Sequence, residues 1–190
     1  MLGNDLLEGE KVRLTALHKT DLPQFVEWFA NIEFRRNLGG IAMPFRPEDE
    51  DAWFEAQRKA EDTCNFAIRL LEGNRLIGSC GVFNVHWLAR NCLVGIGVGD
   101  PAYWGKGYGT DAMRVLLKFA FMEMDMHRVG LEVFSYNLRA KKSYLKIGFR
   151  QECVSREAIW RDGRYYDAIQ MGILRREWET LYLPGGDDAG

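Results

Sequence analysis

Val94-Gly95-Ile96-Gly97-Val98-Gly99, followed by Tyr103-Trp104-Gly105-Lys106-Gly107-Tyr108-Gly109-Thr110, is the stretch on which the fold of this 190-residue chain depends. The first run is apolar and interrupted by glycines, which is typical of a strand that another backbone or a ligand approaches closely. The polar residues that follow are spaced by three, four and seven: Asp111, Arg114, Lys118 and Asp125. This spacing predicts a long, mostly buried helix with one solvated stripe.

The glycines at 105, 107 and 109 lie where the strand gives way to this helix. Glycine adopts positive φ and lets backbone N–H groups approach a ligand, and the first amides of a helix carry partial positive charge. The loop therefore predicts a phosphate or pyrophosphate site, although a tight turn without a ligand has the same composition. Neither the Gly-x-Gly-x-x-Gly spacing of dinucleotide-binding proteins nor the Walker pattern is present.

A second motif runs from Asn137 to Phe149, Asn-Leu-Arg-Ala-Lys-Lys-Ser-Tyr-Leu-Lys-Ile-Gly-Phe. At 3.6 residues per turn, Asn137, Ala140 and Tyr144 share one face of a helix. Gly148 suits a left-handed cap at the end of that helix.

The two motifs in this order resemble the GNAT superfamily of N-acetyltransferases, and within it the branch of ribosomal-protein N-terminal acetyltransferases and spermidine acetyltransferase. Trp104 to Gly109 is similar to the pyrophosphate loop of that family, Gln/Arg-x-x-Gly-x-Gly/Ala. Asn137 to Phe149 matches its Asn-x-x-Ala-x-x-x-Tyr-x-x-x-Gly-Phe helix. The resemblance covers about residues 8 to 176, with one departure, since Trp104 stands where the family usually has Gln or Arg.

The resemblance implies an α/β (α+β) fold with a mixed, mostly antiparallel sheet of six to seven strands, flanked by helices. A parallel strand pair at its centre, around Val94–Val98 and Val129–Phe134, is expected to splay apart, and a helix of crossover length connects the two strands. We expect a single domain over residues 1–183, a disordered tail over 184–190 and, from the resemblance, a homodimer.

The implied activity is acetyl transfer from acetyl-CoA, without a metal, to a primary amine. A protein N-terminus, a polyamine such as spermidine and a small-molecule or antibiotic amine remain open as acceptors. An acyl-CoA-binding regulatory module without turnover is the alternative from another class, and a phosphate-binding nucleotide enzyme is a third hypothesis.

The resemblance also implies roles for individual residues. Tyr144 is expected to be the general acid, because a phenol of pKa about 10 stays protonated at neutral pH. The backbone N–H of Val98 is expected to stabilise the oxyanion. The expected cofactor-binding residues are Gly97, Val98, Gly99, Trp104, Gly105, Lys106, Gly107, Tyr108, Gly109, Thr110, Asn137, Ala140 and Tyr144. The substrate candidates are Glu33, Trp87 and Glu132. The general base stays open among Glu132, Asp100, His86, Glu33 and a water chain.

Composition narrows the function classes further. A formal net charge of -2 gives no bulk electrostatic basis for nucleic-acid binding. No apolar run approaches the roughly 18 residues that span a bilayer, and the N-terminus has no signal-peptide core, so we expect a soluble, cytoplasmic protein. Four separated cysteines and three scattered histidines lack the spacing of metal ligands.

The rest of the chain supplies the other elements of an α/β domain. Thr20-Asp21-Leu22-Pro23 is typical of a helix start, and a second helix is expected from about Glu48 to Asp62. The acidic run 48–51 either offsets the macrodipole of that helix or attracts a cationic amine. Alternation and turn signals predict strands at 11–17, 64–71, 75–83, 91–98, 128–134, 151–158 and 164–174.

Overall fold

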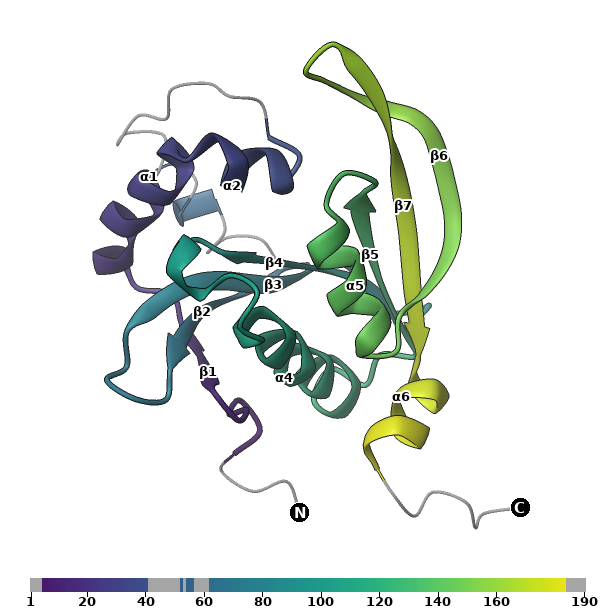
Figure 1. Ribbon diagram of the computed structural model, residues 1–190. Helices are drawn as coiled ribbons and strands as arrows, with labels where there is room; N and C mark the ends of the chain where they lie inside the picture. The colour runs from purple at the N-terminus through teal and green to yellow at the C-terminus, as the bar shows by residue number, and fades with distance from the viewer. Residues whose placement is uncertain (1–4, 41–51, 53, 57–61, 184–190) are drawn as a thin grey trace.

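The computed structural model describes residues 5–40, 52, 54–56 and 62–183, which form a seven-stranded sheet flanked by helices (Figure 1). The strand order is β1-β2-β3-β4-β5-β7-β6. The strands are β1 (Val12–Ala16), β2 (Cys64–Leu70), β3 (Leu76–His86), β4 (Asn91–Val98), β5 (Arg128–Phe134), β6 (Arg150–Arg161) and β7 (Arg164–Leu174). The predicted mixed, mostly antiparallel sheet is confirmed, since β4 and β5 pair in parallel and the other neighbours in this sheet are antiparallel.

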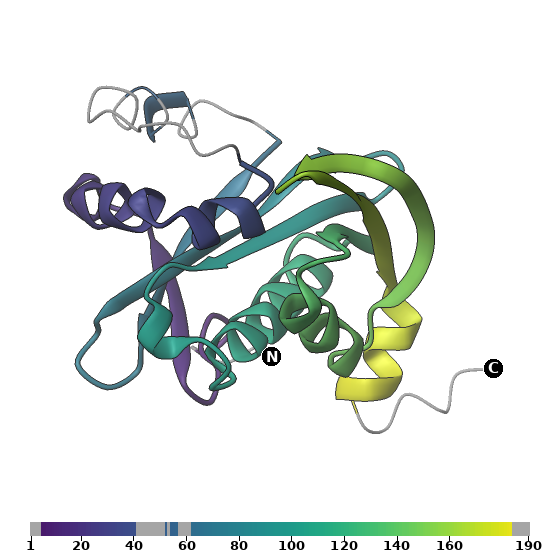
Figure 2. The same ribbon diagram turned by 45° about the horizontal axis from the view of Figure 1, so that its top comes forward.

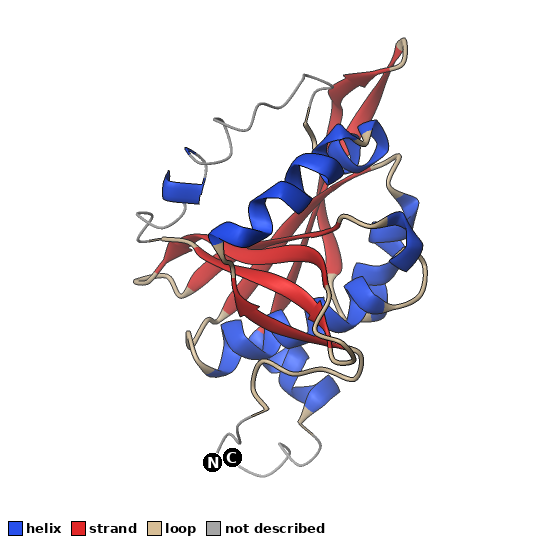
Figure 3. Cartoon of the chain, turned by 90° about the vertical axis from the view of Figure 1, so that its left-hand side faces the viewer, coloured by secondary structure: helices blue, strands red, loops and turns tan. Residues whose placement is uncertain are grey.

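The helices form a layer on each face of the sheet (Figures 2 and 3). Figure 2 shows α1 and α2 on one side, with α4 and α5 on the other. Their bounds are α1 (Leu22–Ala30), α2 (Ile32–Asn37), α4 (Tyr108–Met122), α5 (Leu138–Lys146) and α6 (Arg175–Tyr182), with short 3₁₀ turns η1 (Lys19–Asp21) and η2 (Pro101–Tyr103). Residues of α4 such as Met113, Leu116 and Phe121 are fully buried, so this helix lies at the centre of the main core.

The parallel pair separates, as the family resemblance implies. The register of β4 against β5 runs from Asn91↔Arg128 to Leu93↔Gly130 and includes no later pair. Beyond this point β4 continues to Val98 along β3 alone, because the pairing with β3 extends to Gly78↔Val98. The second half of β4 therefore has one free edge, which faces β5.

The polar groups on that free edge follow from the alternation of an antiparallel ladder. The Gly99 N–H donates to the Ile77 carbonyl on β3 at 2.9 Å, so Gly99 and Gly97 direct their backbone groups toward β3. The residues between them, Ile96 and Val98, direct their N–H and C=O groups into the splay. An extended ligand can use these groups as a further strand would.

The prediction of one solvated stripe on the long helix was wrong at both ends. Asp111 is only 5% exposed, because its carboxylate accepts hydrogen bonds from three backbone N–H groups. Asp125 lies beyond the end of α4 and has a φ of 54°. The spacing of polar residues does not distinguish a buried carboxylate that accepts hydrogen bonds from the backbone from a carboxylate exposed to solvent.

Two short helices escaped prediction. The segment after α1 contains α2, which starts at an Asn31 cap whose side chain accepts from the Phe34 N–H. The chain after β7 forms α6. Most of the predicted second helix, about Glu48 to Asp62, lies outside the described residues. Of its described part, Ala52 and residues 54–56 are helical. The acidic run 48–51 and the tail 184–190 also lie outside the described residues. Within the described part of the chain, no helix combines the length and apolarity needed to cross a membrane.

Gly99 is required by packing, which gives a first prediction. A Cβ at this position would lie 1.9 Å from Cδ2 of Trp28 on α1. Overpacking of this kind costs about 1–3 kcal/mol, so Gly99→Ala should lower the free energy of unfolding in urea by that amount. In a Trp28→Phe background the same change should cost less, because the smaller ring leaves room. An equal cost in both backgrounds would contradict the assignment.

Candidate active site

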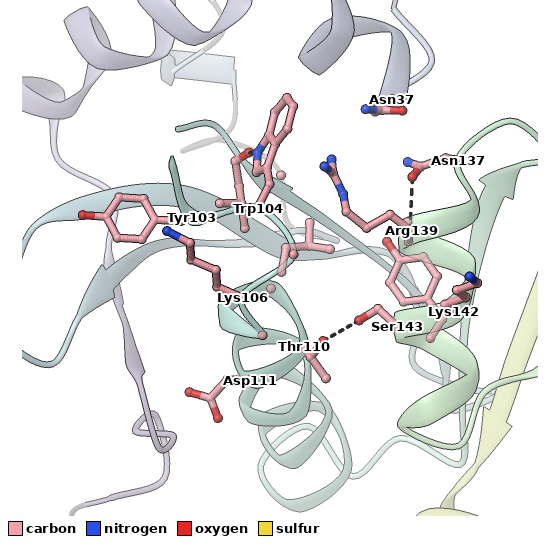
Figure 4. Close-up of a pocket in the computed structure, with 18 of the residues that line it drawn as sticks. Asn37, Tyr103, Trp104, Lys106, Thr110, Asp111, Asn137, Arg139, Lys142 and Ser143 are labelled. Carbon is pink, nitrogen blue, oxygen red and sulfur yellow. Dashed lines mark hydrogen bonds between the residues drawn. The ribbon is translucent and has the colours of Figure 1, made fainter. Parts of the chain in front are cut away.

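A cavity of about 630 Å³ opens at the splay of β4 and β5 (Figure 4). Its walls come from α2, the free half of β4, the loop before α4, the first turns of α4, β5 and α5. A single cavity therefore joins the two sequence motifs, which are separated by the whole of α4 and β5.

The glycine loop forms one end of this cavity. Gly105 and Gly107 have φ of 71° and 87°, a left-handed conformation that other residues rarely adopt. Gly107 is the N-cap of α4, so the unpaired amides of the first helical turn begin directly after it. On the opposite wall, Ser143 of α5 shares a 2.7 Å hydrogen bond with Thr110 of α4. The helix N-terminus and the loop thus present N–H donors suited to an anion.

The loop is held from behind by the N-terminal segment. The carboxylate of Asp111 accepts from the N–H groups of Glu10, Lys11 and Val12 at 3.1, 2.8 and 3.1 Å. The ammonium group of Lys11 in turn donates to the Lys106 carbonyl at 3.1 Å. Lys11 was not predicted as a site residue, because its contacts lie about 100 positions away and no local pattern marks them.

Tyr144 and Asn137 form the α5 wall. Tyr144 is 9% exposed, and burial raises the pKa of its phenol to about 12. The Asn137 side chain caps α5, accepting from the Ala140 N–H at 3.1 Å (Figure 4). Gly148 ends the helix with φ of 104°, which confirms the predicted left-handed cap.

The side chains of Trp104 and Arg139 contact each other at the open end of the β4–β5 pair. The indole N–H of Trp104 donates to the Val98 carbonyl at 2.6 Å. The guanidinium carbon of Arg139 lies 4.3 Å from the centre of the Trp104 ring. Arg139 was not among the residues expected at the site, although it lies within the second motif.

Most of the expected cofactor-binding residues line this one cavity. They are Gly97, Val98, Trp104, Gly105, Lys106, Gly107, Gly109, Thr110, Asn137, Ala140 and Tyr144. Gly99 and Tyr108 do not line it. The Gly99 N–H already bonds to β3, and the Tyr108 ring packs edge-on against Tyr103 with its face toward Lys11.

Of the three substrate candidates, only Glu132 of β5 lines the cavity. Glu33 is exposed in the first turn of α2, and Trp87 is 59% exposed in the turn between β3 and β4. Neither is part of the cavity wall.

The other base candidates have structural roles. Asp100 caps η2 and pairs with Arg75 at 3.0 Å. Nδ1 of His86 accepts from the Ala89 N–H at 3.1 Å in the turn after β3. Glu132 is therefore the one of the four named candidates that the fold brings to the cavity.

The described ranges were searched for side chains that could together bind a metal ion. No group of three or more His, Cys, Asp or Glu side chains there is placed to hold an ion. Burial raises the pKa of the Cys92 thiol to about 12 and that of Cys80 further, so both thiols stay protonated.

Comparison with known proteins supplies the family context. A family model described as an acetyltransferase (GNAT) domain matches residues 11–150. The SPbeta prophage-derived uncharacterized N-acetyltransferase YokL of Bacillus subtilis is 28% identical over 173 residues, covering 90% of this chain and 94% of the relative. The putative ribosomal N-acetyltransferase YdaF of the same organism is 28% identical over 177 residues, covering 90% and 95%.

A solved structure shares the fold. The spermidine N-acetyltransferase from Vibrio cholerae, crystallised in complex with CoA and spermine, superposes with a TM-score of 0.80 at 23% identity. The alignment covers 88% of this chain and 97% of that one.

Proposed function

Because this chain belongs to the GNAT acetyltransferase family, we propose that it transfers the acetyl group of acetyl-CoA to a primary amine. The observation that carries the proposal is the convergence of three features on one cavity: the left-handed glycine loop, the free edge of β4 and the buried phenol of Tyr144. Each feature matches one part of a CoA thioester, namely its diphosphate, its amide-bearing arm and its sulfur.

The residues present fit such a co-substrate. Gly107 and the first amides of α4 supply donors for the diphosphate, and the ammonium group of Lys11 lies close to Gly107. Ile96 offers its backbone N–H and C=O groups to the amides of the arm. When bound, acetyl-CoA supplies an activated acyl group and a thiol leaving group.

Three residues of the chain then carry the chemistry in this proposal. The Val98 N–H, which faces the splay, donates to the carbonyl oxygen as negative charge develops there. The Tyr144 phenol donates its proton toward the sulfur, since its raised pKa keeps that proton in place at neutral pH. Glu132, on the β5 wall, orients the amine and accepts its proton. Holding both substrates in one cavity contributes most of the acceleration.

The acceptor is proposed only as a class. Spermidine is the acceptor named for the Vibrio cholerae structure, and a ribosomal acceptor is named for one Bacillus subtilis relative. A polyamine needs carboxylates for its several ammonium groups, whereas an N-terminal peptide needs an open groove. Glu132 can pair with one amino group, whether the acceptor is a polyamine or an N-terminal peptide.

The test is release of free thiol from acetyl-CoA against a panel of amines: spermidine, N-terminal peptides of ribosomal proteins and aminoglycosides. We expect turnover on one class and a CoA dissociation constant in the micromolar range or below, measured by titration calorimetry. Failure to bind CoA would refute the proposal. Tight CoA binding without turnover on any of the amines would favour a regulatory acyl-CoA-binding module instead.

A further inference from the structure

Trp104 and Arg139 meet across the cavity from opposite walls. Trp104 comes from the loop before α4 and Arg139 from the first turn of α5, and the side chain of Arg139 extends toward the indole ring (Figure 4). The guanidinium carbon lies 4.3 Å from the ring centre, a cation–π stack. The indole N–H is already bonded to the Val98 carbonyl, so the ring itself is fixed.

The charge of Arg139 is ordered but not neutralised. Across the described ranges its guanidinium makes neither an ion pair nor a hydrogen bond, unlike Arg36, which pairs with Asp162, and Arg75, which pairs with Asp100. Stacking uses the face of a guanidinium and leaves its N–H donors at the edge available. Arg139 thus presents a preorganised cation to the cavity that it lines.

Trp104 has no donor left for a ligand, because its single N–H is used on Val98. Gln or Arg, the residues expected at this position from the two-motif resemblance, would each offer polar hydrogen atoms there. In this chain the stacked guanidinium stands beside position 104 in place of such a side chain.

We infer that Trp104 holds Arg139 as an anion-binding arm of the cavity, which takes a group with two anionic oxygens in a bidentate contact. The expected source of that group is the diphosphate of CoA, because Trp104 directly precedes the Gly105–Gly109 loop that cradles it. A carboxylate on the acceptor has the same chemistry and is the other source. This inference rests on the proposed function and adds to it a pair of residues that determines ligand affinity.

The experiment measures dissociation constants by titration calorimetry for CoA and for pantetheine, which lacks the phosphates. Arg139→Gln should weaken CoA binding at least tenfold, the loss of one charge-assisted contact, and leave pantetheine binding unchanged. Arg139→Lys should recover part of the loss. Lys141→Gln is the matched control, since it removes a positive charge from the same helix at a residue that contacts Gln151 outside the cavity.

Trp104 variants test the stack. Trp104→Leu removes the ring and should weaken CoA binding in the same direction as Arg139→Gln, whereas Trp104→Phe keeps a ring and should weaken it less. In the Arg139→Gln background, Trp104→Leu should add little, because the two residues act as one unit. Additive losses would overturn the inference that Trp104 acts through Arg139.

A second set of measurements identifies which ligand supplies the anion. If Arg139→Gln leaves CoA affinity unchanged but raises KM tenfold for an acceptor with a free carboxylate, relative to its amide, the arm holds the acceptor. If neither constant changes by more than twofold while the wild type turns over, the inference is refuted and the proposed function stands. A wild-type protein that does not bind CoA would refute both.

Discussion

Tyr144→Phe is expected to lower kcat about a hundredfold, the lower end of the range for a positioned general acid, while CoA affinity stays within a factor of two. The change removes one oxygen and keeps the ring, so the packing of Tyr144 against Phe149, with ring centres 6.0 Å apart, is retained. Only the proton offered to the sulfur is lost. Initial rates of thiol release with a saturating acceptor measure the effect.

The pH profile separates this role from a packing role. Burial raises the pKa of Tyr144 to about 12, so its proton is retained well beyond the ordinary tyrosine pKa of about 10. The ratio of wild-type to variant rates should therefore stay constant between about pH 7 and pH 10. Tyr182→Phe is the control, because it removes a phenol that donates to the Ile147 carbonyl away from the cavity. A Tyr144→Phe enzyme that keeps more than half of its kcat would eliminate the phenol as the acid.

Features that depend on neighbouring residues were accessible from sequence. The bounds of β4 and β5 agree with the predicted 91–98 and 128–134, because apolar alternation and turn residues are local properties. Asp162-Gly163, a strong turn dipeptide, separates the predicted strands 151–158 and 164–174, and in the structure both residues take positive φ between β6 and β7. Strand bounds and turns of this kind can be predicted because they depend on adjacent residues.

Features that depend on distant contacts were not accessible. The partners of Asp111 precede it by about 100 residues, so a polar residue at a helical spacing was taken for a solvated one. No local pattern indicated that the Gly99 N–H bonds to β3 or that Trp28 fills the space where a side chain of residue 99 would lie. The stack of Trp104 and Arg139 likewise depends on the approach of two elements that the sequence separates.

The splay itself was expected only through the family resemblance, and the structure shows which segments lie along it. α4 starts at Tyr108, directly after its N-cap Gly107, and the loop before it keeps Trp104 against the Val98 carbonyl. The edge of β4 that β5 leaves free is thus partly covered by the loop. The order of elements in the chain places the glycine loop and the free edge in one cavity.

Asp111→Ala is expected to destabilise the protein by about 3 kcal/mol, because it leaves three buried or half-buried backbone donors without an acceptor. For a chain of this size the loss corresponds to a fall in Tm of about 6–12 °C. Asp111→Asn keeps one carbonyl oxygen and turns an amide toward a donor, so it should recover little. Urea titration followed by circular dichroism measures the free energy of unfolding. Glu123→Gln, an exposed change at the other end of α4, should alter it by less than about 0.5 kcal/mol.

The same variant should also weaken the ligand site, which distinguishes Asp111 from an ordinary core residue. Its carboxylate fixes the backbone of Lys11, whose ammonium holds the Lys106 carbonyl of the glycine loop. Once that segment is released, the loop loses its support from behind, and CoA affinity should fall even at temperatures where the variant is folded. Lys11→Met tests the link, since it breaks the contact to Lys106 and leaves the bonds of Asp111 intact. If Lys11→Met and Asp111→Ala both bind CoA as the wild type does, Asp111 stabilises the fold alone and the loop needs no support from Lys11.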